Sequence, residues 1–195
     1  MTEIALVPRT AFQGLLPAAQ AGGVALEEHV GFSLATLIAR RNSAAELAER
    51  VRQQFGIELP IGPRRAAARG LSFLGTGVGT WLVLCDNSDS EFVLSLKQRV
   101  GDAASVSDQS DAYGILRMSG PNVRDALCKV VPVDLHPRAF QVGDVAVTSA
   151  GHMDAILWRL DDLRDGSSAF EIAVYRSLAT TFTFCGISIC DRSSR

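Results

Sequence analysis

Apolar residues in this chain of 195 residues fall into short runs separated by glycine, proline or charged residues. Arg40 and Arg41 interrupt one of the longest candidates for a membrane span, and Asp86 and Asp89 interrupt another. A helix needs about 20 apolar residues to cross a bilayer, so we expect no membrane span. Residues 1–11 lack the basic start and long apolar centre of a signal peptide, and we therefore expect a cytoplasmic protein.

The first half of the chain alternates between strand and helix patterns. Leu47, Val51 and Phe55 recur at helical spacing and predict one buried stripe on a helix that Gly56 ends. Glycines separate the apolar runs at 71–74 and 81–85, which favours a β-hairpin. In this half we expect strands at 32–38, 71–74, 81–85 and 105–107, and helices at about 43–55 and 90–100.

The second half repeats this alternation. A Gly-Pro pair at 120–121 starts a helix whose stripe includes Val123, Leu127 and Val130, and Pro132 ends it. The other elements expected in this half are strands at 113–118, 145–148, 155–158 and 170–174, and a final apolar helix from 176 into the 180s.

These patterns predict an α+β fold made of two packed α/β halves with mainly antiparallel sheets. Residues 11–31 are rich in Gly and Ala, and residues 1–31 are interpreted as an N-terminal arm, followed by a first half at 32–104 and a second half at 105–195. The break near 101–107 is too short and too weakly polar to act as a flexible tether, so the halves are expected to pack together.

Composition limits the partners of the chain. Its 19 basic and 21 acidic residues give a formal charge of −2, which leaves no basic excess for binding nucleic acid. The apolar fraction of 47% is high for a small domain, in which much of the surface must face outward. We interpret this excess as a sign that a partner covers part of the apolar surface.

No catalytic or metal constellation emerges from the residues. Gly75, Gly77 and Gly79 lead into a strand-like run rather than into a helix, so they predict a hairpin turn and not a phosphate loop. The three histidines are scattered, and no second Cys or His pair stands near Cys185 and Cys190, so no metal site is expected. The four cysteines are interpreted as reduced thiols.

Asp154 is the one carboxylate with apolar residues on both sides, Met153 before it and the run at 155–158 after it. This setting predicts partial burial and a raised pKa. The acidic residues at 108, 111, 161, 162 and 165 fall instead in segments typical of turns and solvated loops.

Two segments, VSDQSDAY at 106–113 and LRMSGP at 116–121, resemble the folate-binding aminomethyltransferases of the glycine cleavage system. Further segments resemble the gamma subunits of heterotetrameric sarcosine oxidases, and the resemblance spans about residues 25–185. They are FGIELP at 55–60, GTWL at 79–82, VRDALCKVVPVDLHPRAF at 123–140, ILWR at 156–159 and FEIAVYRS at 170–177.

The resemblance implies a complex that oxidises sarcosine to glycine and yields hydrogen peroxide with either formaldehyde or methylenetetrahydrofolate. Its alpha and beta subunits are expected to carry FAD, FMN and NAD, and its delta subunit zinc, with tetrahydrofolate also bound outside the gamma subunit. The chain would then have alpha, beta and delta subunits as partners and would itself be a structural, non-catalytic subunit. It shows no flavin or nicotinamide fingerprint.

Asp154 is the single folate candidate that the resemblance offers. In the aminomethyltransferases a glycine-rich turn leads into an aspartate pair, whereas residues 151–155 hold one acid and carry His152 where glycine is usual. We therefore do not assign folate chemistry to Asp154. Two alternatives stay open: an independent tetrahydrofolate-binding one-carbon transferase anchored by Asp154, and a folate-dependent scaffold for iron–sulfur assembly, which would need a reactive cysteine.

Overall fold

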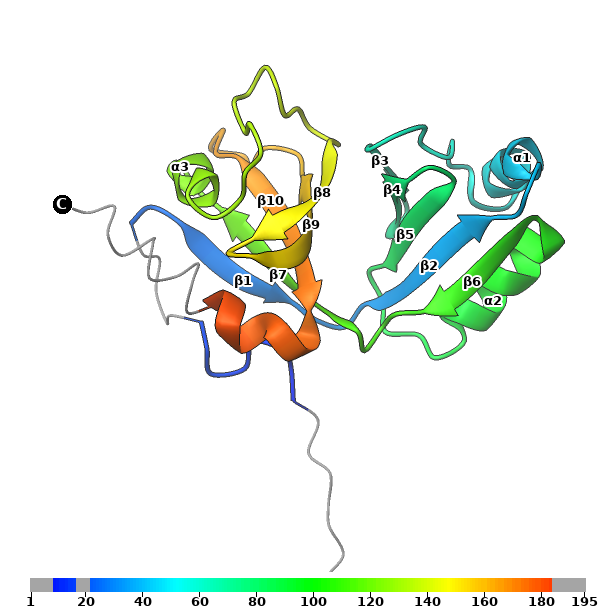
Figure 1. Ribbon diagram of the computed structural model, residues 1–195, viewed down its shortest axis with the longest axis horizontal. Coiled ribbons are helices and arrows are strands. Elements are labelled where there is room, and N and C mark those ends of the chain that lie inside the picture. The colour runs from blue at the N-terminus through cyan, green and yellow to red at the C-terminus, as the bar shows by residue number, and fades with distance from the viewer. Residues whose placement is uncertain (1–8, 17–21, 184–195) are drawn as a thin grey trace, which may run out of the picture.

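The computed structural model describes residues 9–16 and 22–183. They form two five-stranded sheets in which every strand pair is antiparallel, so the expected α+β class is confirmed. Figure 1 shows the two sheets as the arms of a V. Within the described residues, no helix is long and apolar enough to cross a membrane.

The first sheet has the strand order β3-β4-β5-β2-β6. Helices α1 and α2 pack on one of its faces, and the 3-10 helix η1 leads into its last strand. The elements are β2 (Ser33–Ala39), α1 (Ala44–Phe55), β3 (Arg65–Ala68), β4 (Leu71–Gly77), β5 (Thr80–Cys85), α2 (Phe92–Val100), η1 (Gly101–Ala103) and β6 (Ala104–Asp108).

The stripe of α1 packs as its spacing predicts. Leu47 and Val51 are fully buried in one cluster with Phe73, and Phe55 is partly buried against this cluster. Gly56 ends the helix with a φ of 67°, a left-handed conformation that glycine adopts without a Cβ clash.

Helix α2 begins two residues later than its pattern predicts. The Glu91 N–H donates to Asp89 Oδ1 at 2.9 Å, and the Asp89 N–H donates to Ser33 Oγ at 2.8 Å. These bonds hold residues 89–91 in a turn against β2, so the helix starts at Phe92.

The second sheet has the strand order β1-β7-β10-β9-β8. Helix α3 and the helical residues 179–183 pack on one face, in a cluster that includes Val123, Leu127 and Phe182. The elements are β1 (Ala25–His29), β7 (Tyr113–Ser119), α3 (Val123–Cys128), β8 (Val145–Ala150), β9 (Met153–Arg159), β10 (Ala169–Tyr175) and the 3-10 helix η2 (Arg176–Leu178).

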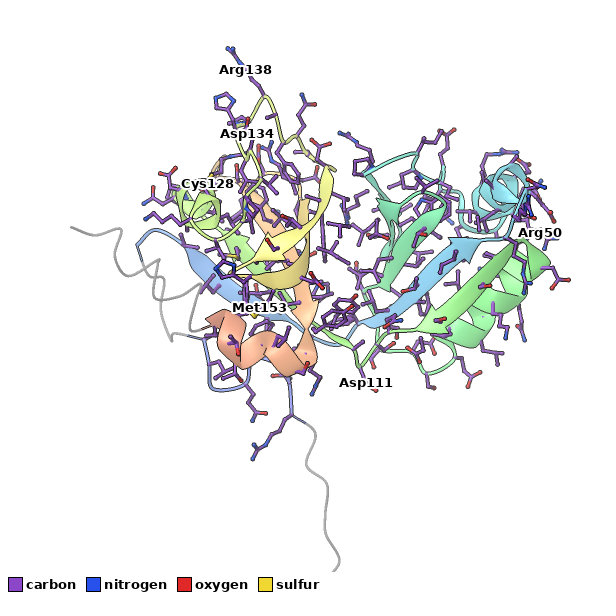
Figure 2. All side chains as sticks on the ribbon, viewed as in Figure 1. Arg50, Asp111, Cys128, Asp134, Arg138 and Met153 are labelled. Carbon is purple, nitrogen blue, oxygen red and sulfur yellow. The ribbon has the colours of Figure 1, made fainter. Side chains whose placement is uncertain are left out.

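Two strands lie in sheets that the chain order does not suggest. Residues 25–29, expected within an arm, form β1 and pair with β7 in the second sheet. Strand β6 pairs with β2 in the first sheet, so the crossing between sheets falls at 109–112, later than the break expected near 101–107. Asp111 marks this crossing in Figure 2. An edge strand with charged residues, such as β1, lacks the apolar alternation that reveals a strand.

The faces of the two sheets that carry no helices pack against each other. Leu34, Leu74 and Leu84 of the first sheet share a buried cluster with Ile115 and Trp158 of the second. Backbone bonds add to this contact, because the N–H of residue 65 donates to the carbonyl of residue 143 at 2.7 Å and that of residue 145 donates to the carbonyl of residue 63 at 2.9 Å. The layers thus run helix, sheet, sheet, helix, as Figure 1 shows.

Candidate functional site

Asp154 lies just after a tight hairpin turn between β8 and β9. Gly151 and His152 form the turn with φ values of 56° and 70°, the pair of positive angles that a two-residue type I′ turn requires. Asp154 is opposite Ser149 and is exposed, so the expected partial burial is wrong. The apolar neighbours Met153 and Ala155 point to the opposite face of the strand and do not cover the carboxylate.

Tyr113 interacts with the charge of Asp154 and forms an aromatic pair with Tyr175. Their rings stack with centroids 4.9 Å apart. Burial raises the pKa of Tyr113, and the hydrogen bond with Tyr175 and the charge of Asp154 raise the pKa further. A phenol with a raised pKa stays neutral at physiological pH and does not serve as a base there.

The other residues weighed as ligands or nucleophiles do not converge. Within residues 9–16 and 22–183, no group of three or more His, Cys, Asp or Glu side chains could hold a metal ion. Cys85 lies on β5 and Cys128 is exposed on α3, both as free thiols. Cys185 and Cys190 lie outside the described residues.

A buried carboxylate lies at the centre of a charged cluster on the second sheet. Glu171 on β10 is 2% exposed, and its Oε1 accepts hydrogen bonds from His29 Nδ1 at 3.0 Å and from Arg117 Nε at 3.1 Å. The same oxygen forms an ion pair with Arg117 Nη2 at 2.9 Å. Its Oε2 accepts a bond from Trp158 Nε1 at 2.9 Å. The four residues come from four strands, β10, β1, β7 and β9, that are adjacent in the sheet.

The partners of Glu171 decide its charge. Burial alone would raise the pKa of this carboxyl, but the hydrogen bond with His29 and the charge of Arg117 hold the pKa below its ordinary value. A cavity of about 180 Å³ lies beside the cluster, lined by residues 27–30 and Arg117. Because both carboxylate oxygens are engaged, we interpret these four residues as a clamp that holds the edge strand β1 on the sheet.

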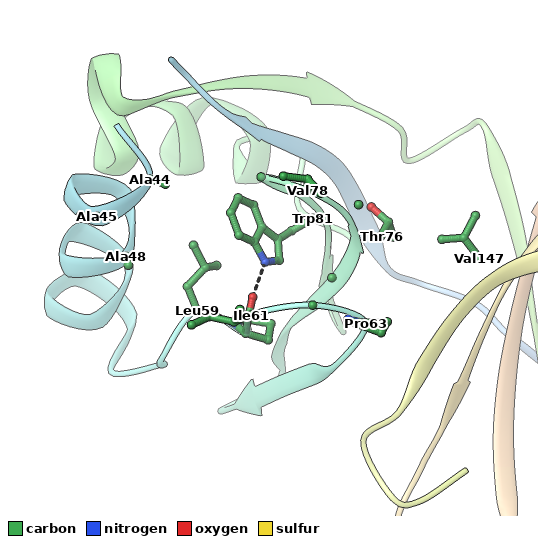
Figure 3. A pocket seen from close by; sticks show the side chains of 15 residues that line it. Ala44, Ala45, Ala48, Leu59, Ile61, Pro63, Thr76, Val78, Trp81 and Val147 are labelled. Atoms are coloured by element: carbon green, nitrogen blue, oxygen red, sulfur yellow. Dashed lines mark hydrogen bonds between the residues drawn. The ribbon is translucent and has the colours of Figure 1, made fainter. Parts of the chain in front are cut away.

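An apolar groove lies at the open end of the V, between α1, the β4–β5 hairpin and the extended loop at 59–63 (Figure 3). Its volume is about 760 Å³, and Val147 of β8 closes its far side. The Trp81 Nε1–H donates to the Pro60 carbonyl at 2.9 Å, so this bond fixes the loop and engages the only donor of the indole.

Small residues keep this groove open. Ala44, Ala45 and Ala48 line it from α1. A Cβ on Gly75 would lie 1.9 Å from the Gly62 carbonyl oxygen, so only glycine allows the loop to approach the hairpin this closely. The hairpin that the glycine pattern predicts is present, with Gly75 and Gly77 at the end of β4 and Gly79 in the turn. The glycines lead into β5 rather than into a helix.

Three large aliphatic side chains on the groove face solvent. Ile61 is 96% exposed, Val78 is fully exposed at 105% and Val147 is 59% exposed. Single exposed aliphatic residues are common, but three around one cavity form a patch. The chemistry that such a surface supports is the burial of apolar side chains from another molecule.

Sequence reasoning missed both the clamp and the groove. Glu171 sits within the apolar run FEIAV, and a charge at such a position signals a buried, paired group. Ile61 and Val78 are apolar residues in turn segments, where polar residues are usual, and this departure marks exposed apolar surface.

Comparison with known proteins assigns the chain to a family. Residues 40–190 match the family described as sarcosine oxidase, gamma subunit. The chain is 30% identical over 142 residues to sarcosine oxidase subunit gamma of an Arthrobacter species, covering 71% of this chain and 68% of that protein. It is 32% identical over 116 residues to the same subunit of Corynebacterium sp. strain P-1, covering 59% of this chain and 56% of that protein.

Two solved structures share the fold. A chain of heterotetrameric sarcosine oxidase from Corynebacterium sp. U-96, in complex with pyrrole 2-carboxylate, superposes with a TM-score of 0.81 at 23% identity, covering 96% of this chain and 97% of that one. Glycine cleavage system aminomethyltransferase T from Bartonella henselae superposes with a TM-score of 0.60 at 14% identity. This match covers 87% of this chain and 49% of that one. The family match spans most of the chain, and so this protein belongs to the sarcosine oxidase gamma subunit family.

Proposed function

We propose that this chain is the gamma subunit of a heterotetrameric sarcosine oxidase and serves there as a structural and assembly subunit. The observation that carries the proposal is the groove of about 760 Å³ with exposed aliphatic residues on its lining. A surface of this kind on a protein of this size is typical of an interaction site. The likeness to a chain of a heterotetrameric enzyme supports the same conclusion.

The reaction belongs to the assembly in this proposal. The complex oxidises sarcosine to glycine and yields hydrogen peroxide with either formaldehyde or methylenetetrahydrofolate. The alpha and beta subunits hold FAD, FMN and NAD, the delta subunit holds zinc, and tetrahydrofolate also binds outside this chain. The gamma subunit contributes surface that holds these subunits together.

The described side chains do not fit tetrahydrofolate at the site that the resemblance indicated. Asp154 is exposed on a hairpin, and neither of the two cavities described above has it in its lining. The lining of the larger groove carries no charged side chain, and it is formed by apolar residues, glycines and Thr76. We therefore derive no chemical step through a cofactor on this chain.

Co-expression with the alpha, beta and delta subunits, followed by size-exclusion chromatography, tests the proposal. We expect the chain to elute with the other three subunits, and flavin absorbance to elute in the same peak. The chain produced alone is expected to associate or to be poorly soluble, because its groove faces water. A monodisperse monomer that does not join the other subunits would contradict the proposal.

The alternative of an independent tetrahydrofolate-dependent transferase makes a different prediction. The architecture that this chain shares with the aminomethyltransferase structure supports the alternative. Calorimetric titration of tetrahydrofolate into the isolated chain should show micromolar binding that Asp154→Asn weakens if this alternative holds. Under the proposed function, neither the chain nor its Asp154→Asn variant binds the ligand.

A further inference from the structure

We propose that the groove between α1 and the β4–β5 hairpin receives an apolar segment of another subunit, and that an acidic residue of this segment pairs with Arg40 or Arg41 at the rim. The inference rests on the proposed function and deepens it, because it assigns the assembly role to one surface. Figure 3 shows this surface from close by.

The lining favours apolar side chains over a polar small molecule. None of the residues that line the groove is charged. The indole donor of Trp81 is already engaged by Pro60, and the Thr76 hydroxyl lies 3.4 Å from the Thr80 carbonyl. A small-molecule site usually places several polar groups to orient its ligand, and this groove has few to offer.

The exposed aliphatic residues indicate that the segment is apolar over its central part. Ile61, Val78 and Val147 come from a loop, a hairpin and the edge strand of the other sheet, and they border one continuous hollow. An inserted segment would bury all three at once. The centre of a protein interface is depleted in charged residues for the same reason.

The rim supplies the charge that the lining lacks. The Ala39 N–H donates to the Gly79 carbonyl at 2.8 Å and the Ser43 N–H donates to the Arg40 carbonyl at 3.0 Å, so residues 40–42 bridge the hairpin corner and the start of α1. Arg40 and Arg41 are exposed, and neither side chain has an ion-pair partner among the described residues.

Arg64, which is also next to the groove, differs from Arg40 and Arg41 because it has an ion-pair partner. Arg64 follows the lining residue Pro63 and is paired with Asp144. The unneutralised positive charge therefore lies at the α1 end of the groove. An acidic residue of the partner segment would complement it there and set the direction in which the segment lies.

The first test compares Val78→Asp with Leu94→Asp after co-expression with the other subunits. Both positions are exposed, but Leu94 lies on α2 outside the groove. We expect Val78→Asp to reduce the amount of this chain retained on the tagged alpha subunit by at least about tenfold, since a charge would be buried on docking. Leu94→Asp should be retained like the wild type.

The second test addresses the rim. The double variant Arg40→Glu with Arg41→Glu should be retained less than the wild type, and the loss should shrink between about 0.1 M and about 1 M salt as screening increases. Arg69→Glu is the matched control, because Arg69 is exposed in the β3–β4 turn away from the groove lining.

Hydrogen exchange of the wild-type complex supplies a measurement that needs no variant. Amides of residues 75–81 should exchange more slowly in the complex than in the isolated chain. Unchanged exchange there, or equal losses for Val78→Asp and Leu94→Asp, would overturn the groove as the docking site. Failure of the wild-type chain to join the complex would instead overturn the proposed function.

Discussion

At the scale of single residues, Glu171 shows how a charge is kept in an apolar sheet. Its carboxylate is 2% exposed and is surrounded by three donors from three other strands. Each donor offsets part of the cost of removing the charge from water. Because one of them is His29, the cluster also fixes β1, which is an edge strand with a single neighbour.

Replacing Glu171 by Gln should destabilise the protein by about 2–3 kcal/mol, since the three hydrogen bonds from His29, Arg117 and Trp158 lose the charge of their acceptor. The measurement is urea unfolding followed by circular dichroism. Glu27→Gln is the control, because Glu27 is exposed on the same edge strand, and its effect should lie within about 0.5 kcal/mol. A loss below about 1 kcal/mol for Glu171→Gln would show that the clamp contributes little.

The lowered pKa of Glu171 also predicts a pH dependence. The folded-state pKa lies below the unfolded value, so the carboxylate stabilises the fold above the unfolded pKa, which is about 4.3. This contribution is lost as the pH falls through the folded pKa. Unfolding free energies measured between about pH 6 and pH 3 should therefore fall less steeply for Glu171→Gln than for the wild type. Parallel curves would contradict the prediction.

At the scale of elements, most helices and strands follow from local patterns. The stripe of α1, the hairpin of β4 and β5, and the strands β7 to β10 lie within a few residues of their expected positions. The two strands that were missed, β1 and β3, are both edge strands. An edge strand packs against one neighbour only, so its sequence carries less of the apolar alternation from which a strand is predicted.

The close contact between the loop at 59–63 and the β4–β5 hairpin predicts an asymmetry between two glycines. Gly75→Ala should destabilise the protein by about 1–3 kcal/mol, because its Cβ would overlap the Gly62 carbonyl. Gly77→Ala is the control, since a Cβ there would meet Thr80 only at an ordinary contact distance of 3.7 Å, and it should change stability by less than about 1 kcal/mol. Urea unfolding of both variants measures the difference, and equal effects would contradict it.

At the scale of the whole molecule, the two sheets share a buried cluster, and each sheet covers the helix-free face of the other. β1 precedes the first sheet in the chain but lies in the second, and between residues 22 and 183 the chain crosses between the sheets twice, at 30–32 and at 109–112. We propose that the halves divide the chain by sheet and behave as one cooperative unit, because neither sheet buries its helix-free face alone.

Cooperative unfolding is the expected outcome of this arrangement. Trp158 is fully buried between the sheets and Trp81 lies in the first sheet, so tryptophan fluorescence reports on the interface and on one half. Urea transitions followed by fluorescence and by far-ultraviolet circular dichroism should have the same midpoint. Two separate transitions would show that the halves unfold independently.

The sequence by itself determined the local elements, the α+β class and the family, because these depend on neighbours in the chain and on motifs within it. Leu47 and Val51 could be placed on a buried stripe without knowledge of what covers them. Only the tertiary structure decided which strand joins which sheet, that Asp154 is exposed, and that His29 meets Glu171 across 142 positions. The groove likewise exists because a loop, a hairpin, a helix and a strand of the other sheet pack around one space. Strand pairing and surface shape depend on long-range contacts, and a local pattern of residues does not specify them.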